Sequence, residues 1–166
     1  MRDGQPVAAQ RALAATLAAG GVALTLTIGG CGRPTSPGAL SIDAGDHALV
    51  AVGERLYATH CARCHGADLS GQPNWRQRRP DGRLPAPPHD ASGHTWHHPD
   101  ALLFGMVKEG FMTGVHAPPG YLSDMPAYGE VLDDREIIAT LAYIKITWPA
   151  AQRTHQARLS QQAAGD

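Results

Sequence analysis

The 166-residue chain has few aromatic residues and almost no net charge. Only 5% of its residues are aromatic, against 19 glycines and 13 prolines, which favours short helices and irregular loops over a large sheet. Its formal charge of −1 at pH 7 lacks the basic excess of nucleic-acid-binding proteins, so we expect no nucleic-acid partner. With so little aromatic bulk, a bound cofactor could complete the core.

The chain also lacks an apolar run long enough to span a membrane. Residues 12–28 carry no charge, but this 17-residue segment is shorter than the roughly 20 residues of a spanning helix. Arg2 and Arg11 precede it, as basic residues precede the apolar part of a signal peptide. The segment therefore predicts export rather than a permanent transmembrane anchor.

The end of this leader has no A-x-A cleavage site. Residues 28–31 read Ile-Gly-Gly-Cys and resemble a bacterial lipobox, in which the cysteine is lipidated and becomes the first residue. We therefore predict a lipoprotein-type signal peptide over 1–30, with Cys31 as the lipidation site. An ordinary cleaved signal with an unpaired cysteine is the alternative. The Pro- and Gly-rich residues 31–45 predict a flexible tether.

Three later segments have helical periodicity, and we expect helices over residues 47–60, 99–109 and 134–148. Asp46 is a predicted N-cap of the first, and Asp133 with Glu136 form a capping box for the third. These helices define a predicted domain over 46–150. The remaining residues, 151–166, predict a polar C-terminal tail that could be a frayed helix.

Cysteine is scarce, and two of the three cysteines lie in the motif Cys61-Ala-Arg-Cys64-His65 at the end of the first predicted helix. A zinc site would need more ligands, and a thioredoxin-like pair would need a βαβ pattern that the sequence lacks. Thiols three residues apart share one helical face, where they can bond the two vinyl groups of a haem. The adjacent imidazole can reach its iron. The motif therefore predicts one covalently attached haem c.

A second axial ligand is expected on the other side of the iron. Met125 is the preferred candidate, because Pro126 biases it toward an extended backbone that can project its thioether inward. Met106 falls on the apolar face of a predicted helix, where core packing is the simpler interpretation. Met112 and a histidine remain alternatives.

The segments GERLYATHCARCHG, SDMPAYG and LDDREIIATLAYIKITWP together resemble the class I c-type cytochromes. The resemblance covers residues 46–149 and implies an all-α, cytochrome c-like fold with long irregular loops, whose first and last helices cross beside the haem. It further implies that Gly53 allows close backbone approach at the crossing and that Tyr143 packs there. His65 should donate its second ring N–H to a backbone carbonyl, which the resemblance places in the loop after the motif.

The loop between the first two helices is longer than in the shortest members of that family. It carries Trp75 and four arginines that could bond the haem propionates or be a solvated basic loop: Arg76, Arg78, Arg79 and Arg83. It also carries a group of histidines that could bind copper or zinc: His89, His94, His97 and His98. A copper-handling haem protein is therefore an alternative function.

The function that these observations favour is one-electron transfer through a haem with His65 and Met125 as axial ligands, with no substrate turned over. We expect it to work in a periplasmic or membrane-surface respiratory chain, with an oxidase, a reductase or a copper protein as redox partner. A lipid on Cys31 would hold it at the periplasmic side of a bacterial membrane; without one it would be soluble in the periplasm. A haem enzyme or sensor with a labile distal ligand is a further alternative.

Overall fold

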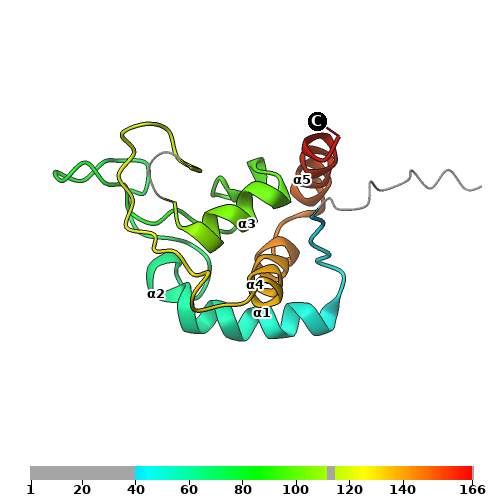
Figure 1. Ribbon diagram of the computed structural model, residues 1–166. Coiled ribbons are helices and arrows are strands. Elements are labelled where there is room, and N and C mark those ends of the chain that lie inside the picture. The colour runs from blue at the N-terminus through cyan, green and yellow to red at the C-terminus, as the bar shows by residue number, and fades with distance from the viewer. Residues whose placement is uncertain (1–39, 112–114, 166) are drawn as a thin grey trace, which may run out of the picture. The chain divides into compact units, whose positions relative to one another are not determined.

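The computed structural model describes residues 40–111 and 115–165, which lie in one compact unit, Pro34–Asp166. This part of the chain contains helices and no strand, so the all-α prediction is confirmed (Figure 1). The elements are α1 (His47–His60), α2 (Ala62–His65), the 3₁₀ helix η1 (Thr95–His97), α3 (Asp100–Glu109), α4 (Asp134–Ile146) and α5 (Ala150–Ala163). The predicted signal peptide, Cys31 and Met112 lie outside the described residues.

The ends of α1 and α4 follow the predicted caps. The Asp46 carboxylate accepts hydrogen bonds from the backbone N–H groups of Ala48 and Leu49. Asp133 accepts from the Glu136 backbone N–H at 2.8 Å, and the Glu136 carboxylate accepts from the Asp133 N–H at 2.9 Å. These bonds satisfy N–H groups that have no partner within the helix, and they fix where each helix begins.

Helices α1 and α4 cross and pack extensively against each other (Figure 1). A Cβ atom on Gly53 would overlap the carbonyl oxygen of Ala139, so only glycine allows the two backbones to approach this closely. Next to the crossing, the rings of Tyr57 and Tyr143 lie 5.4 Å apart between centroids. Both features implied by the family resemblance are confirmed, and the crossing fixes the end of α1 that leads into the cysteine motif.

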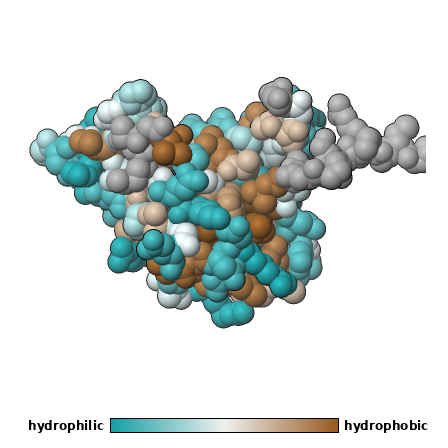
Figure 2. All heavy atoms as spheres, viewed as in Figure 1, coloured by the Kyte–Doolittle hydropathy of each residue, from teal (hydrophilic) through white to brown (hydrophobic). Residues whose placement is uncertain are grey.

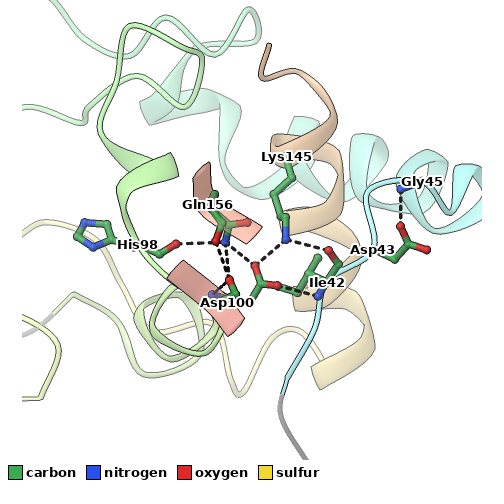
Figure 3. Close-up of polar contacts among 8 residues, drawn as sticks. Ile42, Asp43, Gly45, His98, Asp100, Lys145 and Gln156 are labelled. Carbon is green, nitrogen blue, oxygen red and sulfur yellow. Dashed lines mark hydrogen bonds and ion pairs between the residues drawn. The ribbon is translucent and has the colours of Figure 1, made fainter. Parts of the chain in front are cut away.

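A buried ion pair joins both ends of the unit to its middle (Figure 3). Lys145 of α4 contacts Asp100 of α3 at 2.7 Å, and it also donates to the carbonyl of Ile42 at 2.8 Å. Asp100 accepts from the Ile42 N–H and from the side-chain amide of Gln156 in α5. Ile42, assigned to the tether by the sequence, is therefore buried, and the predicted tail forms α5, whose Gln156 is buried too.

The surface mixes apolar and polar side chains. Figure 2 shows apolar residues gathered in the middle of the face viewed, with hydrophilic residues around them. Within residues 40–111 and 115–165, four large hydrophobic side chains are exposed, namely Val52, Val115, Leu122 and Val131. Among the helices of the described residues, none is long and apolar enough to cross a membrane.

Candidate haem-binding site

The two motif cysteines lie on one turn at the end of α1. Cys61 follows the last residue of α1 and donates its N–H to the Tyr57 carbonyl, and the next residues form the short helix α2. Gly66, with a positive φ of 81°, ends this turn. Cys61 is half-buried, Cys64 is exposed, and both thiols are free within the described residues. Burial, together with the nearby Cys64, raises the pKa of Cys61 to about 11, so its thiol stays protonated at neutral pH.

His65 is held as a neutral imidazole with one nitrogen free for a metal. Its Nδ1 lies 2.8 Å from the carbonyl oxygen of Pro87. Because a carbonyl can only accept, Nδ1 carries the proton and Nε2 keeps its lone pair. Burial lowers the pKa of His65, and the Pro87 hydrogen bond opposes this shift only partly. The predicted backbone-carbonyl partner is confirmed, but it belongs to Pro87, 22 residues after His65, and does not come just after the motif.

The Pro87 carbonyl is positioned by close packing of two loop segments, residues 71–72 and 86–88. Gln72 donates its N–H to the Ala86 carbonyl at 2.9 Å, and its side-chain oxygen accepts from the Ala86 N–H at 3.0 Å. Gly71 has a φ of 70° and donates to the His65 carbonyl at 2.8 Å. A Cβ there would lie 2.5 Å from the Pro88 nitrogen, so glycine is needed for the segments to meet.

His89 is a second imidazole of this site, although the sequence analysis placed it among the possible copper or zinc ligands. Its ring stacks on that of His65, with centroids 3.8 Å apart and planes inclined by 15°. Its backbone is fixed from two sides, since its N–H donates to the Leu69 carbonyl and its carbonyl accepts from the Trp148 indole. Burial holds the pKa of His89 well below its usual range, and its buried Nδ1 has no hydrogen-bond partner among the described residues.

Met125 lies half-buried in the loop before α4. Its N–H donates to the Ser123 hydroxyl at 3.0 Å. Three residues later, the Tyr128 hydroxyl donates to the His60 carbonyl at 2.8 Å, which brings this segment to the end of α1 beside the cysteine motif. Met106 is half-buried on α3. The axial role of Met125 stays a prediction.

The four clustered histidines do not come together. His89 stacks on His65, whereas the other three gather near η1, with His98 Nε2 3.3 Å from His94 Nδ1. The ring of His155, from α5, lies 5.8 Å from that of His97. Within the described residues, no group of three or more histidine, cysteine or acidic side chains is arranged to hold a metal ion.

The four arginines of the long loop all have partners in the protein. Arg79 and Arg83 contact Asp124, the residue before Met125. Arg76 stacks over the Trp75 ring at 3.9 Å, and Arg78 donates to the Gly82 carbonyl. From the sequence, these arginines were expected to contact propionates or to be solvated. Asp124 could not be identified as their partner, because it lies about 40 positions away in an aperiodic loop.

The donor set fits haem c. Two free thiols lie one turn apart, a neutral imidazole on the next residue has an available Nε2, and a buried imidazole nitrogen beside it has no partner among the described residues. A haem would use the thiols for thioether bonds and the imidazole as an iron ligand.

Comparison with known proteins agrees with this arrangement. Residues 48–144, more than half of the chain, match the family model described as cytochrome C oxidase, cbb3-type, subunit III. No curated protein and no solved structure matches the chain. Because the matched region contains most of both crossing helices and the whole C-x-x-C-H motif, the chain belongs to this family of class I c-type cytochromes, whose covalently bound haem c transfers electrons.

Proposed function

We propose that this cytochrome is a one-electron carrier in which Cys61 and Cys64 form thioether bonds to haem c and His65 Nε2 is an axial ligand. The observation that carries the proposal is the 2.8 Å contact between His65 Nδ1 and the Pro87 carbonyl. It orients the ring, keeps Nε2 unprotonated and raises its basicity as a ligand. When bound, the haem supplies an iron that accepts one electron from a reduced partner and passes it to an oxidised one.

Met125 is the proposed second ligand. The Tyr128 hydroxyl bond to His60 supports it, because this bond holds the segment after Met125 against the helix end that precedes Cys61. A thioether is neutral and favours ferrous iron relative to a second imidazole, so this ligand pair predicts a fairly high reduction potential.

The experiment compares Met125→Ala with the matched control Met106→Ala in the exported holo-protein. We expect Met125→Ala to lose the far-red sulfur-to-iron absorption band and to have a lower reduction potential, whereas Met106→Ala retains both. An unchanged band and potential in Met125→Ala would remove Met125 from the site. If carbon monoxide binds the reduced wild-type protein at neutral pH, the distal position is labile and a haem enzyme or sensor becomes the better assignment.

The cellular setting is part of the proposal. The leader over residues 1–30 and the lipobox before Cys31 support export and lipid anchoring on the periplasmic side of a bacterial membrane. A single acyl chain would hold the protein only marginally, so we expect more than one; the mass of the mature N-terminal peptide tests this. The proposed partners are redox proteins, among them an oxidase, a reductase or a copper protein, and no substrate is turned over.

A further inference from the structure

The loop that carries Met125 is joined to the long loop after the haem motif by two ion pairs that meet on one carboxylate. Arg79 Nη2 lies 2.6 Å from Asp124 Oδ2, in hydrogen-bond geometry. Arg83 Nε lies 2.9 Å from Asp124 Oδ1, outside hydrogen-bond geometry, so this contact is ionic. Asp124 directly precedes Met125, so both pairs act next to the proposed iron ligand.

The two arginines project from a closed turn, residues 78–83, which we call the arginine turn. Arg79 donates its N–H to the Arg83 carbonyl at 2.8 Å and accepts from the Gly82 N–H at 2.9 Å. The Arg78 guanidinium closes the turn further by donating to the Gly82 carbonyl at 2.7 Å. These bonds fix the turn internally, so the two guanidinium groups are presented to Asp124 from a defined backbone.

The arginine turn also lies against Tyr121 and Leu122 of residues 120–129, which we call the Met125 loop. The Arg78 guanidinium lies 5.5 Å from the centroid of the Tyr121 ring. Leu122 Cδ1 lies close enough to Gly82 that a Cβ atom built on this glycine would be 3.5 Å from it. A cation–π contact and the approach of Leu122 therefore accompany the ion pairs at Asp124.

We propose that Arg79 and Arg83 are positioning residues that hold Met125 at the iron through Asp124, an inference that rests on the proposed axial role of Met125. The Met125 loop has no helix of its own between Gly120 and Gly129. Fixing it from outside reduces the conformational entropy that the chain gains when the thioether leaves the iron. The two guanidinium groups already share the Asp124 carboxylate, so this role accounts for their charge without a propionate.

The solvent exposure of the three charged side chains sets the expected size of their effect on methionine binding. The side chains of Arg79, Arg83 and Asp124 are 38–56% exposed, so each ion pair is weak and screened by salt. Two such pairs on one carboxylate are expected to change the equilibrium between bound and released methionine about fivefold. Added imidazole competes with the methionine for ferric iron, so its apparent affinity reports this equilibrium.

The test is a titration of the ferric holo-protein with imidazole. Binding is monitored by the loss of the far-red sulfur-to-iron absorption band. Asp124→Asn should bind imidazole about fivefold more tightly than wild type, and Arg79→Gln with Arg83→Gln should do the same. Asp81→Asn is the matched control, because Asp81 lies 3.6 Å from Arg83 on the arginine turn itself but does not contact the Met125 loop. About 1 M NaCl should weaken the difference between wild type and Asp124→Asn, since the Debye length is then about 3 Å.

Each outcome decides the proposal. Tighter imidazole binding by Asp124→Asn and by Arg79→Gln with Arg83→Gln, but not by Asp81→Asn, supports it. Equal affinities in wild type and Asp124→Asn, or equal changes in Asp124→Asn and Asp81→Asn, overturn it. Met125→Ala separates the two levels: if it binds imidazole no more tightly than wild type, the axial assignment fails together with the positioning role. If only Asp124→Asn is silent, the positioning role fails alone.

Discussion

At the residue scale, the position of the proposed iron ligand His65 depends on a second imidazole, His89, whose ring stacks on it. His65 is fixed by the Pro87 carbonyl at its edge and by the His89 ring at its face. The Leu69 carbonyl and the Trp148 indole fix the backbone of His89. A ligand whose ring plane is held by two independent contacts loses little freedom when it binds a metal, which favours tight coordination.

His89→Phe and His89→Ala separate the ring of His89 from its nitrogen. Removing the buried ring should cost about 2–4 kcal/mol of unfolding free energy in His89→Ala, because a cavity is left against His65. His89→Phe keeps the stacked face and removes a buried nitrogen without a partner among the described residues, so we expect a change below about 1 kcal/mol. Denaturant unfolding of the holo-protein measures both. Equal destabilisation by the two substitutions would mean that the nitrogen has a partner in the holo-protein.

The contrast between His65 and its neighbours shows what the sequence can predict. The C-x-x-C-H spacing is local, so one helical turn is enough to place Cys61, Cys64 and His65 together. The partners Pro87 and His89 come from a loop of glycines and prolines that has no period, more than 20 positions away. Nothing in such a segment specifies which of its residues returns to the motif, and His89 was accordingly assigned to a group of histidines that it does not join.

At the element scale, the close crossing of α1 and α4 depends on one residue without a side chain, Gly53. Gly53 costs helix α1 about 1 kcal/mol relative to alanine, yet a Cβ atom there would overlap the Ala139 backbone. The caps at Asp46 and Asp133 were predictable because a cap depends on residues within one turn. The crossing itself followed only from the family resemblance, since a lone glycine in a helix has several explanations.

Gly53→Ala tests the crossing against helix propensity. We expect it to lower the unfolding free energy by about 2–4 kcal/mol despite better propensity, since the added methyl group must separate two packed backbones. Ala51→Gly, at an exposed position of the same helix, is the control and should cost only about 1 kcal/mol. Thermal and denaturant unfolding of the holo-proteins provide the measurement. A Gly53→Ala protein as stable as wild type would show that the helices can separate at no cost.

At the scale of the whole molecule, the Asp100 and Lys145 pair connects parts of the chain that the sequence assigned to different regions. The pair joins α3 to α4, and its remaining bonds reach Ile42 on one side and Gln156 on the other (Figure 3). A residue of the predicted tether and a residue of the predicted tail therefore meet at one buried point. Periodicity could not reveal this, because α5 is polar on most of its surface and contributes one fully buried side chain, Gln156.

A double-mutant cycle measures how strongly this point holds the molecule together. Lys145→Met leaves a buried carboxylate without its cation, and Asp100→Asn leaves a buried ammonium without its anion, so each should cost about 3–5 kcal/mol of unfolding free energy. The double variant buries no unpaired charge, so it should be clearly more stable than the sum of the single losses predicts. Because the partners of the pair lie at both ends of the unit, the single variants should also increase amide hydrogen exchange in α5 and around Ile42. Strictly additive losses, with exchange unchanged in α5, would mean that the ends are held by other contacts and that Lys145 and Asp100 act separately.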